Sequence, residues 1–434
     1  MKRLRHYTVW YGFIFVFCCT PAFSTPKDEL QPSDIAYLEQ VMKDTWNYID
    51  FYVAPETGFP YDSNTKPEKS NTTNVGLYLA SIAVAHRLGY IKEQDAILKI
   101  SKVLRSLEKI QSWNYLYNNW LSVTGDTNAY AGPNNISDYN KLPAGLILVR
   151  QEFPQLSDEC SRMLDKVNWG IFYQPETEKI FYEFDIVNKT VNRPVFISRG
   201  EDKLLGAFLM VASGKVPPTT WDHHLMGEAD MEEKYGLKYF KPGWQGGGLF
   251  MQFICGMFLD ETGTKLGYSE ANFAFAQIIH AKKIGSPVWG WSASQNPDGG
   301  YLGMGQIRDS VVTPHACLLA IGLYPKAVVN NLRKLEQMGA RAPIVINGRE
   351  HAFGFHDALN TDTGKVDPDF LVLDQAMAFL SLANFLEDDV VRKMFKQDPM
   401  VANGLKLILE YSIKDGDKVR FRNYVNSLNK RQIN

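Results

Sequence analysis

The sequence predicts an all-α fold in which helical hairpins stack side by side and close into a toroid, with long loops on one face. Two observations support this prediction. Apolar residues recur at intervals of three and four along much of the chain, which is the pattern of a helix with one buried face. The connections between the expected helices alternate between short turns and long loops, as expected when helical hairpins follow one another.

The helices can be placed from this periodicity and from their start signals. The clearest pattern is in 93–110, where the apolar positions are Ala96, Ile97, Ile100, Val103, Leu104, Leu107 and Ile110. Similar patterns predict helices at 33–48, 75–88, 142–153, 156–164, 203–212, 247–259, 272–284, 314–323, 325–338, 370–386, 390–396 and 400–412. Thr313-Pro314, Asp398-Pro399 and the polar segment 71–74 provide capping oxygens before three of them. A short strand hairpin is expected at 170–173 and 180–184, around a turn at 176–178.

The long connections are the most informative part of the chain. Some turns are short, as at 88–91 and 322–325, whereas five loops are long: 51–73, 112–140, 214–245, 286–312 and 339–369. Long loops in compact domains are usually functional or disordered, and these contain too many aromatic residues for disorder. We therefore expect them to build a binding face.

The first 24 residues resemble a cleavable secretory signal. Basic residues at 2, 3 and 5 precede an apolar run at 7–19, and Ala22-Phe23-Ser24 places small residues before a polar segment. We expect cleavage near Ser24, a periplasmic or secreted product without a membrane span, and one domain at 25–434. Cys255 and Cys317 lie in apolar runs and are expected to be core residues, although a disulfide between two of the three remaining cysteines stays possible.

Several functional classes are excluded. The net charge is −2 and no basic stripe is present, so nucleic acid is not an expected partner. Gly300 to Gly305 has the wrong spacing and context for a dinucleotide loop, and no Walker A motif or serine-hydrolase elbow occurs. His223, His224 and Glu228 could hold a metal, but a polar loop explains them better. No cofactor and no metal are expected.

Carboxylates beside aromatic residues and glycines remain as candidate chemistry. They are Asp62, Asp126, Asp138, Glu201, Asp298, Asp309, Asp357 and Asp374. Each alone is more simply a helix cap or a solvated charge: Asp138 could cap the next helix, and Glu201 stands where a helix dipole favours a negative charge. Asp374 differs, because it lies inside the apolar segment 370–379 and should face a partner or a polar cavity.

This combination fits carbohydrate chemistry. The loop 289–305, WGWSASQNPDGGYLGMG, offers indole and phenol rings on which a sugar face can stack, while Asn-Pro-Asp-Gly makes Asp298 a turn residue. Glycosidic cleavage needs one protonated carboxyl group and a second carboxylate that activates water or attacks the anomeric carbon. From these residues alone, we expect an exported helical enzyme or binder of glycans.

Ordered motifs extend this expectation. In the first half they are Thr45-Trp46, Thr57 to Asp62, Thr72 to Leu79, Trp120 to Gly125 and Ser137 to Leu146. In the second half they are Gly200 to Lys203, Trp289 to Ser294, Val312 to Ala316, Phe353 to Asn360 and Asp374-Gln375. The set resembles the bacterial glycoamylase-like family, which includes β-1,2-glucan-degrading endoglucanases, and the related domain of cyclic β-1,2-glucan synthases. The part at 25–170 is similar to an N-terminal module of unknown function often joined to that domain, and 171–434 is similar to the core part.

The resemblance implies an (α/α)6 toroid that hydrolyses a β-linked glucan with inversion, β-1,2-glucan being favoured. It assigns the general acid to Glu201, and makes Asp374 and Asp138 candidates for the base or for positioning water. The expected substrate-binding residues are Trp289, Trp291, Tyr301, His315, Phe355, Asp357, Gln375, Asp309 and Trp244. We expect a monomer that binds an oligo- or polysaccharide.

Some motifs depart from the family pattern. Ser310 follows Asp309 where glycine is usual, Ala376 replaces a glycine after Asp374-Gln375, and Gln252 stands where a glutamate is expected. The segment 216–245 also differs. The alternatives are therefore a non-catalytic glycan-binding or envelope polysaccharide biogenesis protein on the same fold, and a lyase or transglycosylase.

Overall fold

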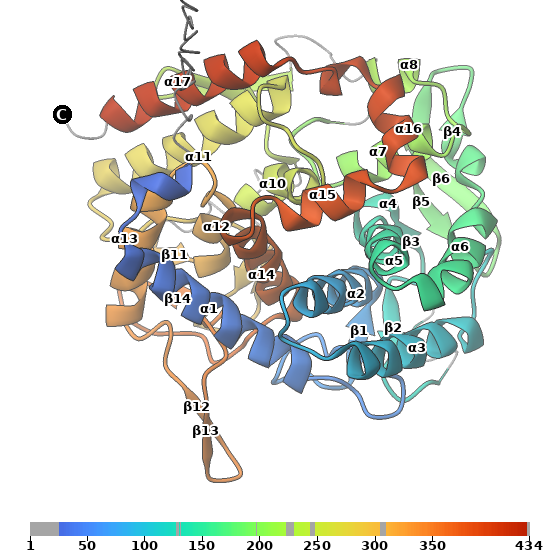
Figure 1. Ribbon diagram of the computed structural model, residues 1–434, viewed down its shortest axis with the longest axis horizontal. Coiled ribbons are helices and arrows are strands. Elements are labelled where there is room, and N and C mark those ends of the chain that lie inside the picture. Colours follow the sequence, from blue (N-terminus) through green and yellow to red (C-terminus); the bar gives the residue numbers. More distant parts are fainter. Residues whose placement is uncertain are drawn as a thin grey trace, which may run out of the picture.

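Helices form most of the regular structure in the computed structural model, which describes residues 26–126, 130, 132–196, 198–222, 230–243, 248–303 and 310–431 (Figure 1). The helices before residue 200 are η1 (Pro26–Glu29), α1 (Pro32–Phe51), α2 (Thr72–Arg87), α3 (Glu93–Lys109), α4 (Ile136–Tyr139), α5 (Lys141–Glu152), η2 (Pro154–Leu156), α6 (Ser157–Lys166) and η3 (Trp169–Phe172). Those after it are α7 (Leu204–Ala212), α8 (Thr219–Asp222), α10 (Leu249–Phe258), α11 (Lys265–Ile284), α12 (Pro314–Leu319), α13 (Pro325–Gln337), α14 (Val372–Leu386), α15 (Val390–Lys396), α16 (Pro399–Leu407), η5 (Leu409–Tyr411) and α17 (Asp415–Arg431).

The strands are short and belong to small separate sheets. They are β1 (Lys69–Asn71), β2 (Trp120–Ser122), β3 (Asn134–Asn135), β4 (Tyr173–Gln174), β5 (Lys179–Asp185), β6 (Thr190–Val195), β7 (Met231–Lys234), β8 (Leu237–Phe240), β9 (Ser294–Gln295), β10 (Tyr301–Leu302), β11 (Val311–Val312), β12 (Ile344–Ile346), β13 (Arg349–His351) and β14 (Leu359–Asn360). The expected hairpin is confirmed in part, since Tyr173 pairs with Ile180 but 170–172 lies in η3 rather than in a strand. It is part of a larger antiparallel sheet, because β5 also pairs with β3 and β6. The fold is therefore mainly helical rather than purely helical.

Inner and outer helices can be told apart by burial. All residues of α7 and α10 are buried, and so are nearly all of α2 and α14. α3 buries only one face, with Ala96, Ile100, Val103, Leu104 and Leu107. The inner helices are α2, α5, α7, α10, α12 and α14, and they pack respectively against the outer helices α3, α6, α16, α11, α13 and α1. α14 also contacts α2, so the last inner helix lies beside the first (Figure 1).

The alternation of connections is confirmed and has a geometric consequence. Short turns lead from inner to outer helices between α2 and α3 and between α12 and α13, whereas α7 and its outer partner α16 are far apart in the chain. Long connections lead from an outer helix to the start of the next inner helix, as from α1 to α2, from α11 to α12 and from α13 to α14. The N-terminal ends of the inner helices therefore lie among the long loops.

The helix starts differ in detail from the expectations. Asn71 caps α2, and Asp398 caps α16 by accepting the Met400 amide at 3.0 Å. Thr313 does not cap α12, because its hydroxyl donates to the Asp357 carbonyl oxygen at 2.6 Å instead. The final helix α17 was not predicted from the sequence.

The structure also describes the state of the cysteines and bears on membrane spans. Cys160, Cys255 and Cys317 are free and buried, so the expectation that Cys255 and Cys317 are core residues is confirmed. Throughout the described residues, every helix falls short of the length and apolarity that a bilayer crossing requires. The segment 1–24, predicted to be a secretory signal, lies outside the described residues.

Candidate active site

A cavity of about 730 Å³ lies where several inner helices begin. It is lined by Asn71 and Thr73 at the start of α2, Ser137 and Asp138 in α4, Glu201 to Lys203 before α7, Phe250 and Met251 at the start of α10, and Leu371 and Leu373 at the start of α14. Loop and strand residues complete the wall: Asp62, Lys66, Lys69, Asn119, Trp120, Asn135, Lys141, Tyr182, Glu183, Arg193, Val195, Gln295 and Tyr301. The cavity thus combines residues from 62 to 373, which are brought together only by the closed arrangement of helices.

Glu201 and Asp138, two of the three predicted catalytic residues, both line this cavity. Glu201 forms an ion pair with Lys203, and its side chain is 23% exposed. Asp138 does not cap a helix: its own amide is bound by Asn135 Oδ1 at 2.9 Å, and Asn135 is the cap of α4. The Asp138 carboxylate is free to face the cavity.

Two amide side chains hold the Asp138 carboxylate. Asn119 Nδ2 and Asn135 Nδ2 donate to Asp138 Oδ2 at 2.9 and 2.6 Å. Burial raises the pKa of Asp138, while Lys141 and these two amides lower it. Donors directed at the oxygens favour the charged form and fix its orientation. Asp138 is therefore a held carboxylate, suited to accept a proton or to orient a water molecule.

Glu201 has a different environment. Burial raises its pKa above the ordinary glutamate value, and the adjacent Lys203 opposes that rise. A raised pKa keeps a carboxyl group protonated nearer neutral pH, which is what a general acid requires. Close packing also restricts this side chain, since a Cβ on Gly243 would lie 1.9 Å from Glu201 Cγ.

Aromatic side chains form part of the same wall. Tyr301, predicted from the sequence, is 49% exposed, although protein surrounds it closely enough that burial is the main cause of its raised pKa. Both observations hold for a ring that projects into a solvent-accessible cavity. Trp120 and Tyr182 line the cavity too, and Lys69 Nζ lies 3.6 Å from the Trp120 ring centroid.

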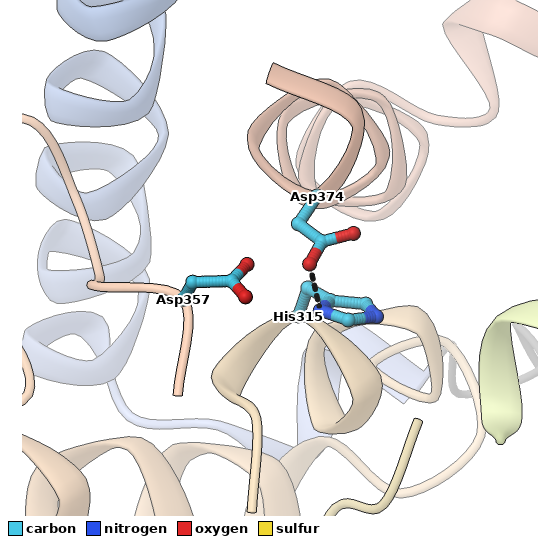
Figure 2. A group of neighbouring side chains, drawn as sticks. All are labelled: His315, Asp357 and Asp374. Carbon is cyan, nitrogen blue, oxygen red and sulfur yellow. Dashed lines mark ion pairs between the residues drawn. The ribbon is translucent and has the colours of Figure 1, made fainter. Parts of the chain in front are cut away.

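Asp374, the third predicted catalytic residue, lies in a separate small cavity of about 10 Å³, which is room for about one water molecule. Asp374 is 2% exposed, and its Oδ2 lies 3.0 Å from His315 Nδ1 (Figure 2). Asp357, Phe355 and Gln375 line the same small cavity. These predicted sugar-binding residues are therefore buried behind the large cavity rather than on its wall.

The two tryptophans of the 289–305 loop also differ from expectation. Trp289 and Trp291 are 6% and 0% exposed, and neither lines the large cavity. Asn331 accepts the Trp289 amide at 2.9 Å, and Gln277 accepts the Trp291 amide at 2.9 Å. Their rings offer no free face to a sugar in this structure, so they anchor the loop in the core while Tyr301 reaches the cavity. The turn at Asp298 is confirmed by the bond from the Gly299 amide to the Asn296 carbonyl, 2.7 Å.

Gln252, a departure from the family pattern, has a structural explanation. Its Nε2 donates to the Phe240 carbonyl at 2.6 Å, and its Oε1 accepts from Ser269 Oγ at 2.8 Å. It does not line the large cavity. The amide therefore satisfies backbone and side-chain partners in the core, and its presence removes no carboxylate from the cavity wall.

Trp244, Asp309 and the histidine pair at 223–224 lie outside the described residues. Conversely, sequence reasoning did not assign Trp120, Tyr182, Lys66 or Arg193 to the site. Trp120 does lie in one of the motifs quoted above. The amide of its neighbour Asn119 could have marked Trp120 as a site residue, since tryptophan beside amides is typical of a sugar-binding wall.

The chain matches two known families. The glycoamylase family matches residues 208–399, and a family of proteins of unknown function matches residues 40–170. The chain is 20% identical over 291 residues to the cyclic β-(1,2)-glucan synthase NdvB of Rhizobium meliloti, which corresponds to 62% of this chain. It spans only 10% of the length of that relative.

Solved structures share the fold. The endo-β-1,2-glucanase of Chitinophaga pinensis, in complex with sophorotriose and glucose, superposes with a TM-score of 0.72 at 17% identity, covering 87% of this chain and 98% of that one. The β-1,2-glucanase of Parabacteroides distasonis gives a TM-score of 0.73 at 17% identity, covering 88% and 60%. The helical arrangement of this chain is therefore one already known among glucan-degrading enzymes.

Proposed function

Because the chain carries a domain of the glycoamylase-like family, preceded by the module of unknown function, we propose that it is an exported glycoside hydrolase that cleaves a β-linked glucan. The pairing of six inner with six outer helices supports the (α/α)6 toroid as its architecture. β-1,2-Glucan is the favoured substrate, because proteins of this fold include β-1,2-glucanases. The domain at 25–434 acts as a monomer.

The observation that carries this proposal is the large cavity. Its volume of about 730 Å³ falls within the range of ligand-binding sites, roughly 300–1,000 Å³. Glu201 and Asp138 face it, together with Trp120, Tyr182 and Tyr301. Aromatic rings can stack on the apolar faces of a sugar, and carboxylates can bind its hydroxyl groups and run acid–base chemistry.

In the proposed reaction Glu201 protonates the glycosidic oxygen. Its raised pKa keeps the proton available, and Lys203 stabilises the carboxylate that remains after transfer. A carboxylate on the other side of the scissile bond then activates the attacking water, which inverts the anomeric centre. Asp138 and Asp374 are the two candidates for that base.

The test is hydrolysis of a panel of glucans by the purified protein, with product analysis by mass spectrometry. We expect release of new reducing ends from β-1,2-glucan. Glu201→Gln should lower kcat by about 10²–10⁴-fold, the contribution typical of a general acid. The matched control is Glu233→Gln, because Glu233 is exposed on β7 and does not line the cavity.

Calorimetry with the same panel distinguishes the alternative function. A non-catalytic glycan-binding or envelope polysaccharide biogenesis protein would bind an oligosaccharide without turnover, and Glu201→Gln would then change nothing but affinity. Unsaturated or rearranged products would indicate a lyase or a transglycosylase. Full activity in the Glu201→Gln variant would refute the assignment of the acid.

Export is part of the proposal and has its own test. The signal-like segment at 1–24 supports a periplasmic or secreted product cleaved near Ser24. Mass spectrometry of the protein recovered from the periplasm or medium of an expressing bacterium should show a mature chain that begins near Thr25. An uncleaved chain retained in the cytoplasm would contradict this.

A further inference from the structure

His315, Asp357 and Asp374 form a closed buried group next to the large cavity. Figure 2 shows Asp374 projecting from α14 and Asp357 from the segment before β14, both toward His315 on α12. Their exposed fractions are 2%, 1% and 4% for Asp374, Asp357 and His315, and one ligand atom of each lies within 4.8 Å of the others. Among the described residues, neither carboxyl group pairs with a lysine or an arginine. Two buried carboxyls therefore face each other without a permanent cation.

Such a pair cannot carry two charges at acceptable cost. Two adjacent carboxylates repel each other, and burial removes the solvent that would stabilise them. Within the described part of the chain, Asp357 Oδ1 has no hydrogen-bond donor, and the nearest donor to Asp374 Oδ2 is the neutral His315 ring, 3.0 Å away. Either a bound cation or a shared proton removes this conflict.

The hydrogen bonds of Thr313 disfavour a cation held by this group. The Thr313 hydroxyl has one hydrogen, which it donates to the Asp357 carbonyl oxygen at 2.6 Å. Its contact of 2.7 Å with His315 Nδ1 is then an acceptor contact, so Nδ1 carries the proton. A protonated Nδ1 cannot ligate a metal, and in Figure 2 the other ring nitrogen points away from Asp357. A proton is the better occupant.

We propose that Asp357 is a positioning residue that holds one proton and donates it in a hydrogen bond to Asp374, so that the pair carries a single negative charge located on Asp374. The Gln295 amide supports this arrangement from the other side, since it donates to Asp357 Oδ2 at 2.6 Å and leaves Oδ1 for the proton. Gln295 also lines the large cavity, so the pair lies directly behind the wall of the proposed site.

The protonation equilibria agree with this geometry. Burial and Asp374 raise the pKa of Asp357 well above the ordinary value, so it stays protonated. Burial raises the pKa of Asp374 to about 7, and the hydrogen bond with Asp357 acts against that rise. Burial lowers the pKa of His315 to about 4, which leaves its ring neutral. The other titratable groups around the pair are His356, Asp62, Tyr301 and Tyr48, and none is a cation at neutral pH.

This inference rests on the proposed function for its kinetic consequence, and two substitutions at one position test it. Asp357→Asn keeps a neutral donor facing Asp374, so kcat on β-1,2-glucan should stay within about threefold of the unaltered enzyme and its pH profile should not move. Asp357→Leu keeps the branched shape of the side chain but removes the donor. The pKa of Asp374 should then rise, and the acidic limb of the kcat profile should move to higher pH by about one unit or more.

An infrared measurement tests the proton without relying on activity. At pH 8 the difference spectrum between the unaltered protein and Asp357→Asn should show loss of one protonated-carboxyl band. Asp44→Asn is the matched control, because Asp44 is a buried aspartate that pairs with Arg341 at 2.6 Å and should contribute no such band. Thermal unfolding shows whether each variant is folded.

The outcomes separate this inference from the proposed function. Absence of turnover in the unaltered protein refutes the hydrolase, whereas the infrared result still decides the shared proton. An unchanged carboxyl band in Asp357→Asn overturns the inference. So does a large loss of kcat in Asp357→Asn that added Zn²⁺ or Mn²⁺ modulates, because a neutral amide binds a divalent cation more weakly than a carboxylate does. A pH profile in Asp357→Leu that matches the unaltered enzyme overturns the link to the reaction.

Discussion

The same side chain, a carboxylate, has three different environments around the candidate site. Asp138 accepts bonds from two amides, Glu201 pairs with a lysine, and Asp374 faces a second buried carboxyl group. The sequence singled out all three, because a carboxylate in an apolar or aromatic context needs an explanation. Their environments could not be predicted, since the partners Asn119, Lys203 and Asp357 become neighbours only through the fold or through side-chain geometry.

Lys203 provides a prediction at this scale. It lowers the pKa of Glu201, so Lys203→Met should raise that pKa further. A general acid works in its protonated form, and activity is lost as pH rises through its pKa. The alkaline limb of kcat/KM on β-1,2-glucan should therefore move to higher pH, by roughly one unit. A pH–rate profile measures this.

The matched control for Lys203 is Lys215→Met, which removes the same charge from an exposed turn after α7. Its profile should coincide with that of the unaltered enzyme. If the alkaline limb of Lys203→Met stayed in place or moved to lower pH, Glu201 would not be the group that titrates there.

Among the elements, the outer helices were the easiest to predict. α3 exposes one face and buries the other, so its apolar residues show a clear period. The inner helices bury nearly all of their residues, so their apolar positions show a less one-sided pattern. The strands β3, β9, β11 and β14 have two residues each, too few to show an alternating pattern. α17 was missed because only Phe421, Val425 and Leu428 of its seventeen residues are buried.

The crossing of α2 and α5 depends on glycine, which the periodicity did not reveal. A Cβ on Gly145 would lie 2.1 Å from the Gly76 carbonyl oxygen, and a Cβ on Gly76 would lie 2.2 Å from the Lys141 carbonyl oxygen. The two backbones therefore approach each other more closely than any side chain allows. This contact fixes α4, with Asp138, relative to the start of α2.

Gly145→Ala tests that contact. In an exposed helix interior this change would stabilise by roughly 1 kcal/mol, because alanine is the better helix former. Here the methyl group meets backbone that cannot move aside, so we expect destabilisation by about 1–3 kcal/mol or more. Thermal or urea unfolding measures it. Gly322→Ala is the control, since nothing in the described part of the chain beyond its own neighbours lies within 4 Å of the added methyl group. Equal melting temperatures for the two variants would contradict a tight crossing.

At the scale of the molecule, the sequence predicted the architecture better than the site. Alternating connections indicated a ring of hairpins with loops on one face, and the structure places the cavity among those loops. Trp289 and Trp291 were assigned to the cavity wall because tryptophan commonly binds sugars, yet both are core residues. Local composition identifies a loop that shapes the site, but only three-dimensional packing decides which of its rings, here Tyr301, reaches the cavity.

The way the chain closes leads to a last prediction, about domain organisation. α1 and α2, from the region that matches one family, pack against α14 from the region that matches the other. Arg150 of α5 pairs with the fully buried Asp398 at 2.6 Å, which again joins the two regions. Separating them would expose the buried faces of α2 and α14 and leave this aspartate without its partner. We therefore expect 25–434 to be one folding unit.

Expressed alone, residues 26–196 should show no cooperative thermal transition by circular dichroism and should be degraded rapidly by protease, whereas the intact chain should unfold with coincident near- and far-ultraviolet transitions. A fragment that melts cooperatively near the temperature of the intact chain would instead identify the N-terminal region as an independent domain, and the cavity would then lie between two domains.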